Sequence, residues 1–172
     1  GELICAGLNN NLLAEELSPS LSSLERNLCQ WFCKKLGLGD LSGGVAASGG
    51  SLSNLMALVM ARNIAGLESD PSAVFFASDD CHVSFSKALR IMGLSQESLQ
   101  KIPTDENGAL KISSLRSSLK KIKSEGKKCF AVVATAGTTV RGAIDPISEI
   151  AQFCKNEDVW LHVDGAIGGI YS

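Results

Sequence analysis

The chain has 172 residues, enough for one domain with its own hydrophobic core. Hydrophobic residues make up 45% and charged residues 20%, which is typical of a globular protein rather than a disordered one. The formal net charge of -2 provides no basic field for nucleic acid or for an anionic lipid surface. The longest apolar run, Leu55 to Ala61, is too short to cross a bilayer. We therefore expect neither a nucleic-acid partner nor a membrane partner.

The six cysteines form no CxxC pair, and the only histidines are His82 and His162. A zinc site would need ligands gathered from distant parts of the chain, so we expect no metal. We interpret the cysteines as buried free thiols. Free thiols are typical of a reducing compartment, which indicates the cytoplasm or an organelle matrix.

The first predicted helix has two possible starts. Ser18-Pro19 reads as an N-cap followed by proline at the first helical position, whereas Ser22 with Glu25 fits a capping box. Apolar residues at helical spacing follow, and Gly37 ends the helix. Residues 1–40 are therefore predicted to be an N-terminal helical segment. A glycine-rich stretch over 41–50 then opens a second domain, 41–172, whose first helix covers about 51–64.

Three short apolar runs in the second domain predict buried strands at 73–77, 129–134 and 159–163. Amphipathic segments over 85–92, over 112–122 and after Asp145-Pro146 predict helices between and beside them. Lys111, Lys120, Lys121 and Lys123 lie on the outer face of the second of these helices, and we interpret them as a solvated face. Apolar strands alternating with amphipathic helices predict an α/β fold with a mainly parallel sheet, covered by helices on both faces.

Ligands of a parallel α/β sheet bind beyond the carboxyl ends of its strands, where four unusual segments of this chain fall. The first is Ser48-Gly49-Gly50-Ser51, ahead of a helix. Glycine backbone N–H groups, a helix N-terminus and a serine hydroxyl are suited to bind an anion. An ordinary connection in which Ser51 is the N-cap explains the same residues equally well. The segment matches neither GxGxxG nor the P-loop, which disfavours a dinucleotide or ATP.

The other three segments carry a histidine, a run of threonines and an aspartate. His82 follows the first strand and is suited to stack on a planar ring or to move a proton, although a loop histidine is often only a surface group or a helix cap. Thr135 to Thr139 follow the second strand, and a turn that satisfies its own backbone explains them as well. Asp164 ends the third strand, where a carboxylate is costly unless it is paired.

In this order the segments resemble the group II pyridoxal-phosphate-dependent amino-acid decarboxylases, such as the glutamate, aromatic-amino-acid and cysteine-sulfinate decarboxylases. The resemblance covers about Leu17 to Gly169. It is carried by Ser18-Pro19 with Glu25 and Trp31, by Gly44 to Leu55, by His82-Val83-Ser84 with Lys87-Ala88, by Thr135 to Thr139 with Gly142-Ala143 and Asp145-Pro146, and by Trp160 to Asp164.

The resemblance implies a role for each candidate residue. Gly50 and Ser51 would hold the phosphate of pyridoxal 5'-phosphate, and Thr139 would lie near its aldehyde side. His82 would stack on one face of the pyridine ring, and Ala166 would pack against the other. Asp164 would pair with the protonated ring nitrogen and keep the ring an electron sink. His82 and Asp164 are thus the candidate catalytic residues.

The resemblance also implies that the chain is an incomplete large domain of the type-I, aspartate-aminotransferase-like fold. The family shows Asp-Ala-Ala where this chain has Asp164-Gly165-Ala166. The family's Schiff-base lysine follows a histidine, and no lysine of this chain lies in a His-Lys pair. We therefore expect the lysine to lie beyond Ser172, so that the full-length parent is the enzyme and the chain alone is inactive.

Some assignments remain open between alternatives. We interpret Asp145 as the N-cap of its helix rather than as a catalytic group. The resemblance implies a small-molecule amino-acid substrate and a homodimer with active sites at the subunit interface. Another enzyme of the same fold, either an aminotransferase or a lyase of phosphorylated long-chain bases, is the nearest alternative. A non-catalytic binding module is the alternative from a different class.

Overall fold

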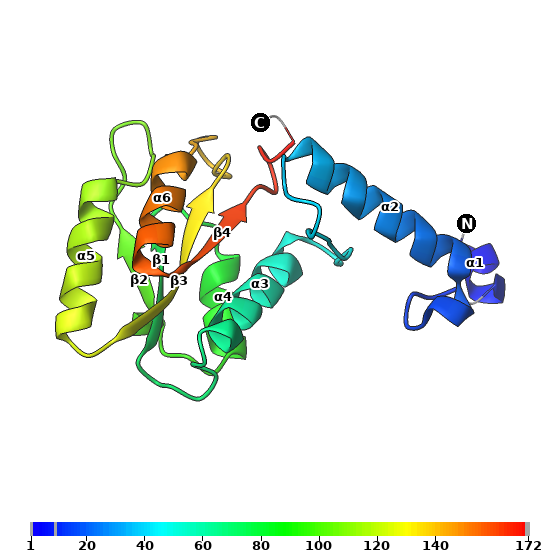
Figure 1. Ribbon diagram of the computed structural model, residues 1–172, viewed down its shortest axis with the longest axis horizontal. Helices are drawn as coiled ribbons and strands as arrows, with labels where there is room; N and C mark the ends of the chain where they lie inside the picture. Colours follow the sequence, from blue (N-terminus) through cyan, green and yellow to red (C-terminus); the bar gives the residue numbers. More distant parts are fainter. Residues whose placement is uncertain (1, 9, 171–172) are drawn as a thin grey trace. The chain divides into compact units, whose positions relative to one another are not determined.

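A computed structural model describes residues 2–8 and 10–170 of the chain (Figure 1). The chain divides into two compact units, Gly1–Ala47 and Ser48–Ser172. The first unit contains helix α1, Glu2–Leu8, a 3-10 turn at Glu15–Leu17, and helix α2, Pro19–Lys35. No helix in the described part of the chain is long and apolar enough to span a bilayer.

Helix α2 begins at the first of its two predicted starts. Ser18 occupies the N-cap position and Pro19 the first helical position. The predicted capping box is wrong, because the Glu25 carboxylate instead accepts a hydrogen bond of 2.7 Å from the backbone N–H of Ala46. Large apolar side chains lie exposed along this helix rather than in a core; they include Leu24, Leu28 and Trp31.

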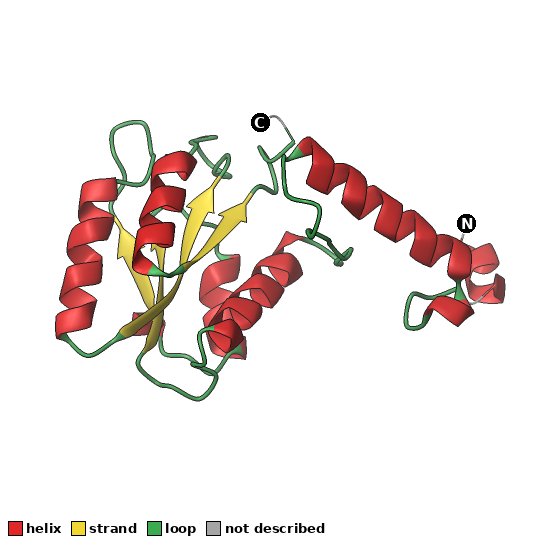
Figure 2. Cartoon of the chain, in the orientation of Figure 1, coloured by secondary structure: helices red, strands yellow, loops and turns green. Residues whose placement is uncertain are grey.

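The second unit contains a four-stranded sheet (Figure 2). Its strands are β1 at Ala73–Ser78, β2 at Leu99–Ile102, β3 at Lys128–Thr135 and β4 at Trp160–Asp164. All neighbouring strands are parallel, in the order β2-β1-β3-β4, which confirms the predicted parallel sheet. The sequence did not predict β2, a four-residue edge strand in which Gln100 and Lys101 interrupt the apolar pattern.

Helices cover both faces of this sheet (Figure 1). Helix α3, Gly50–Ile64, and helix α4, Ser84–Ile91, pack on one face, where Phe75 and Val133 point. Helix α5, Ile112–Ser124, and helix α6, Ile147–Glu157, pack on the other face, over Phe76 and Val132. Because adjacent strand residues point to opposite faces, a central strand covered on both faces must be apolar along most of its length. This is why the strands appear in the sequence as continuous apolar runs.

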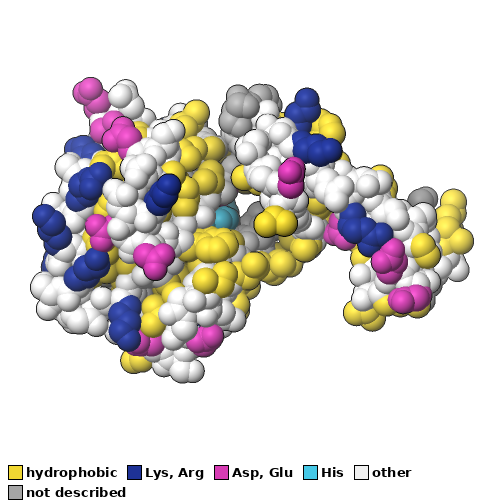
Figure 3. All heavy atoms as spheres, in the orientation of Figure 1, with side chains coloured by type: hydrophobic (Ala, Val, Ile, Leu, Met, Phe, Trp, Pro, Cys, Tyr) yellow, Lys and Arg dark blue, Asp and Glu magenta, His cyan; other side chains and the backbone are white. Residues whose placement is uncertain are grey.

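The lysines of α5 face solvent, as predicted, and acidic partners lie among them. Lys123 pairs with Glu157 at 2.7 Å, and Lys121 lies 3.9 Å from Glu125. In Figure 3, basic and acidic side chains are interspersed over this side of the second unit. Exposed pairs of this kind contribute little stability, and their mixed signs create no strong basic field.

The strand order positions a ligand site. From β1 the chain crosses to β2 at one edge of the sheet, whereas from β3 it continues to β4 at the other. The order therefore reverses between β1 and β3, and in open α/β sheets a crevice forms beyond the carboxyl ends of the strands at such a point.

Candidate functional site

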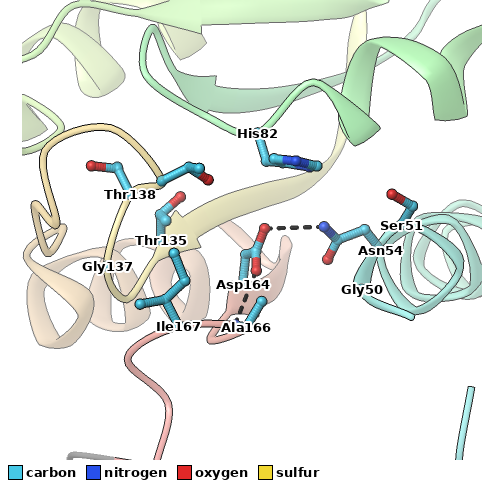
Figure 4. Close-up of a pocket in the computed structure, with 11 residues that line it drawn as sticks. Gly50, Ser51, Asn54, His82, Thr135, Gly137, Thr138, Asp164, Ala166 and Ile167 are labelled. Carbon is cyan, nitrogen blue, oxygen red and sulfur yellow. Dashed lines mark hydrogen bonds between the residues drawn. The ribbon is translucent and has the colours of Figure 1, made fainter. Parts of the chain in front are cut away.

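A pocket of about 250 Å³ lies at the carboxyl ends of β1, β3 and β4 (Figure 4). Its volume suits one small molecule. The structure brings all of the predicted site residues into its lining, although they come from segments far apart in the sequence. These residues are Gly50, Ser51, His82, Thr139, Asp164 and Ala166.

The glycine-rich segment provides one wall of the pocket. Gly49 has a φ of 152° and occupies the N-cap position, so helix α3 begins at Gly50. The interpretation of Ser51 as the N-cap is therefore wrong, and its hydroxyl lies in the first helical turn. The first N–H groups of a helix lack intrahelical acceptors and carry partial positive charge. This wall is therefore suited to bind an anionic group.

Asp164 ends β4 and is only 8% exposed. Its Oδ1 accepts a hydrogen bond of 3.2 Å from the Ala166 N–H, and its Oδ2 accepts one of 3.0 Å from the Asn54 side-chain amide. The dashed lines in Figure 4 mark these bonds. A carboxylate oxygen has room for a second donor, so Asp164 can still pair with a cationic N–H in the pocket.

His82 lies on the loop between β1 and α4. Its Nδ1 accepts a hydrogen bond of 3.2 Å from the Ser84 backbone N–H and lies 2.9 Å from the Ser84 hydroxyl. In the neutral ring the proton is therefore on Nε2. Figure 4 shows the His82 ring on one side of the pocket and Ala166 on the opposite side. A flat ring fits between such walls.

Three threonines lie where β3 ends. Thr135 is only 4% exposed, and its hydroxyl, which has no hydrogen-bond partner among the described residues, lies in the pocket lining. The Thr138 hydroxyl accepts a hydrogen bond of 3.0 Å from Ala143, so this part of the segment does satisfy its own backbone. Thr139 also lines the pocket. The buried hydroxyl of Thr135 is therefore a candidate to form a hydrogen bond with a polar atom of a bound molecule.

Asp145 is not the N-cap that the sequence predicted. Its carboxylate accepts hydrogen bonds of 2.8 Å from the backbone N–H groups of Leu110 and Thr135. Pro146 occupies the N-cap position of α6, and no side chain caps this helix. Burial raises the pKa of Asp145, and the two N–H donors oppose that rise. Asp145 thus ties the chain before α5 to the end of β3.

The sequence interpretation missed Asn54, which is 5% exposed on helix α3. Its amide nitrogen donates to Asp164 Oδ2 and to Ser84 Oγ, each at 3.0 Å. Its oxygen lies 2.8 Å from His162 Nε2. A signal was present in the sequence, because Asn54 is a polar residue on the helical stripe that continues through Leu58 and Ala61, both of which are buried.

Parallel strands, helices on both faces and a pocket at the reversal of strand order define an α/β domain that binds a small ligand. Comparisons with known proteins are more specific. Residues 1–171 match the model of the pyridoxal-dependent decarboxylase conserved domain. The chain therefore belongs to the pyridoxal-dependent decarboxylase family, which uses pyridoxal phosphate.

Individual relatives span nearly all of this chain. It is 38% identical to an aromatic-L-amino-acid decarboxylase of Bacillus atrophaeus, with 97% of this chain and 35% of the relative covered. It is 35% identical to the acidic amino acid decarboxylase GADL1 of Xenopus tropicalis, with 96% and 34% covered. The crystal structure of mouse CSAD superposes with a TM-score of 0.91 at 32% identity, covering 98% of this chain and 37% of that one. The chain thus spans about a third of the length of these relatives.

The pocket residues suit the family's cofactor. The helix N-terminus at Gly50 and Ser51 suits a phosphate, and the gap between His82 and Ala166 suits a pyridine ring. Asp164 has room for one more N–H donor, and the Thr135 hydroxyl lacks a partner. In the described part of the chain no group of His, Cys, Asp or Glu is arranged to hold a metal ion.

Proposed function

We propose that the full-length protein carrying this chain removes the α-carboxylate of an L-amino acid as CO2 and releases an amine. The observation that carries this proposal is the meeting of Gly50, Ser51, His82, Asp164 and Ala166 around one pocket, although up to 116 residues separate them in the chain. The same set of residues supports pyridoxal 5'-phosphate as the ligand. The chain by itself lacks the family's His-Lys pair, and we propose that it does not catalyse decarboxylation alone.

The proposed binding roles follow from the positions of the residues. Gly50 and Ser51 bind the phosphate through backbone N–H groups and the Ser51 hydroxyl, assisted by the dipole of α3. His82 and Ala166 hold the ring from opposite sides and limit its tilt. Thr139 binds near the aldehyde side. Together these contacts fix which atom of the cofactor faces the substrate.

Asp164 has the proposed electrostatic role. Its carboxylate accepts the N–H of the pyridine nitrogen and keeps that nitrogen protonated, because an ionised acceptor stabilises a nearby positive charge. When bound, pyridoxal phosphate supplies the electron sink for the electron pair released as CO2 departs. His82 lines the pocket, and in the ring whose Nδ1 accepts from the Ser84 N–H the Nε2–H can donate a hydrogen bond to a bound group.

We further propose a homodimer. The exposed apolar side chains of α2 support it, since apolar surface of this kind usually marks an interface; Leu24 is 61% exposed, Leu28 52% and Trp31 52%. Sedimentation of the full-length protein tests this proposal, and a fully active monomer would contradict it. The six cysteines are free, which supports a reducing location such as the cytoplasm or an organelle matrix. The expectation that all of them are buried is wrong, because only Cys33 and Cys154 are buried and Cys5 is exposed.

The deciding experiment uses the full-length protein loaded with pyridoxal phosphate. L-amino acids carrying 13C in the carboxyl group are supplied in two sets, one with aromatic and one with acidic side chains. Labelled CO2 and the matching amine are both measured by mass spectrometry. We expect both products from members of one set. Borohydride reduction of the loaded protein should fix the cofactor on a lysine beyond Ser172.

The alternatives give different products. An aminotransferase would form an oxo acid with a suitable acceptor and release no CO2. A lyase of phosphorylated long-chain bases would leave the labelled amino acids intact and cleave a carbon–carbon bond of its own substrate. A binding module would hold the cofactor without turning over either substrate. Attachment of the cofactor to Lys87 would show that the proposed residue assignments are misaligned.

A further inference from the structure

The side chain of Asn54 lines the pocket and lies at the centre of a hydrogen-bond network beside it (Figure 4). Its amide nitrogen donates to Asp164 Oδ2 and Ser84 Oγ, each at 3.0 Å, and its oxygen lies 2.8 Å from His162 Nε2. All of its side-chain hydrogen-bonding atoms therefore have partners from β4 or the start of α4. At 5% exposure, Asn54 has little access to water that could replace them.

The partners allow only one orientation of the amide. An ionised carboxylate can only accept, so the NH2 group of Asn54 must face Asp164. The amide oxygen must then face His162, and because this oxygen can only accept, His162 must carry hydrogen on Nε2. A flipped amide would place its oxygen against the carboxylate oxygen. Asp164 thus fixes the orientation of the amide, and His162 matches it by donating to the amide oxygen.

This donation controls where the Asp164 carboxylate points. Among the described residues, the only other hydrogen bond to that carboxylate comes from the Ala166 N–H at 3.2 Å, and it reaches the other oxygen. Asn54 and Ala166 therefore hold one oxygen each and prevent rotation about the last side-chain bond. Without Asn54, one buried oxygen would lose its donor, and the carboxylate could turn away from the pocket or take up a proton.

We propose that Asn54 is a positioning residue that holds the Asp164 carboxylate aimed at the pyridine nitrogen of the cofactor. This inference rests on the proposed function, because it assigns to Asn54 the support of a residue that acts on the cofactor. Asn54 contributes through Asp164, and so it affects the protonation of the ring nitrogen more than substrate binding.

The test compares two variants with matched controls in the full-length protein. Asn54→Leu keeps a similar volume and removes both the donors and the acceptor, and Asn54→Ala removes them with less steric demand in case the leucine variant does not fold. Asn63→Leu and Asn63→Ala are the controls, because Asn63 is an exposed asparagine near the end of the same helix. Asp164→Asn is the reference for complete loss of the charge.

The main readout is the 15N chemical shift of pyridoxal phosphate labelled at the pyridine nitrogen and bound to each variant. We expect a protonated nitrogen in the wild type and in both Asn63 variants, and a shift toward the unprotonated value in both Asn54 variants. In steady-state kinetics kcat should fall roughly tenfold while KM changes less, because the loss concerns a hydrogen bond to a charged group that acts on the chemical step.

Three results would overturn the inference, and they are distinguishable. If the Asp164→Asn variant loses the protonated signal but every folded Asn54 variant retains it, Asn54 does not position Asp164, although the proposed function stands. If the wild type binds no labelled cofactor, or binds it unprotonated, the proposed role of Asp164 fails and that of Asn54 fails with it. A loss of signal in the Asn63 variants as well would show that the effect arises from general damage to helix α3.

Discussion

The regions around Asp145 and Asp164 show two uses of a buried aspartate at neighbouring strand ends. Asp145 is 3% exposed and Asp164 is 8% exposed. Asp145 accepts two short hydrogen bonds of 2.8 Å from backbone N–H groups and joins two segments of chain. Asp164 accepts one longer backbone bond of 3.2 Å and one of 3.0 Å from a side chain, and it lines the pocket.

The two carboxylates differ in whether they can still accept a hydrogen bond from a bound ligand. Both donors to the Asp145 carboxylate are backbone N–H groups, one just before α5 and one at the end of β3. The carboxylate therefore satisfies buried backbone groups and holds these two segments together. Asp164 keeps an approach open from the pocket side. Burial of a carboxylate therefore does not identify a functional group by itself; the direction from which its donors come distinguishes the two. Substitutions should then separate an effect on chemistry from an effect on folding.

Asp164→Asn in the full-length protein should have the largest effect. Asparagine keeps the shape and can still accept from Asn54, but it cannot hold the pyridine nitrogen protonated. We expect kcat to fall by about 100-fold or more, with cofactor binding affected less. The unfolding midpoint should fall modestly, because the new NH2 group faces the N–H of Ala166, whose bond to Asp164 is the longer of the two. Steady-state kinetics and thermal unfolding measure the two quantities. Full activity in the Asp164→Asn variant would show that Asp164 does not have the proposed electron-sink role.

Asp145→Asn should show the opposite pattern. An N-cap tolerates asparagine, but the observed role does not, because one of the two backbone N–H groups would face an amide NH2 instead of an oxygen. We expect the free energy of unfolding to fall by about 1–3 kcal/mol, with cofactor affinity and kcat nearly unchanged in the folded protein. Denaturant unfolding checks the first value. An unchanged stability would mean that these two bonds contribute nothing measurable.

Thr135 connects the two regions, since its backbone N–H binds Asp145 and its side chain lines the pocket. Thr135→Val keeps the branched shape that suits a strand and removes a buried hydroxyl that has no partner in the described structure. We expect stability to be unchanged or slightly higher and cofactor affinity to fall roughly fivefold, the value of one neutral hydrogen bond. Titration of the apoprotein with pyridoxal phosphate measures this affinity.

Ser78→Ala is the matched control for that titration. Ser78 also has a buried hydroxyl without a partner in the described structure, at the end of β1, but it does not line the pocket. Its removal should leave cofactor affinity unchanged. Equal losses in the two variants would show that the Thr135 effect comes from altered strand packing rather than from a contact with the cofactor.

The sequence predicted the framework of the second unit because the central strands are buried on both faces and β4 is also apolar apart from His162 and Asp164. Continuous apolar runs therefore revealed β1, β3 and β4, whereas the short edge strand β2 carried no such run. All of the candidate pocket residues were chosen from strand ends and the family resemblance. Asn54 was missed although its place on the buried helical stripe was a signal, because the partners that give it importance lie 30 to 110 residues away. Asp145 was misinterpreted for the same reason, as its partner Leu110 is 35 residues distant.

The smallest expected effect concerns His162, which anchors Asn54. Burial lowers the pKa of His162 below its ordinary value, and the nearby Asp164 carboxylate partly opposes this shift. In the window between the two pKa values the unfolded chain binds a proton that the folded chain does not. The stability contributed by neutral His162 is therefore fully present above about pH 6.5 and declines as the pH falls through the lowered pKa.

His162→Gln isolates this contribution, because glutamine can still donate to the Asn54 oxygen but does not titrate. Unfolding midpoints of the full-length apoprotein and of this variant are compared between about pH 8 and pH 5, a range that brackets the ordinary histidine pKa. Other titrating groups are common to both proteins and cancel in the difference. We expect the wild type to lose stability relative to the variant as the pH falls. A difference that stays constant over the whole range would show that His162 has the same pKa folded and unfolded. Burial of His162 would then not disfavour its protonated ring.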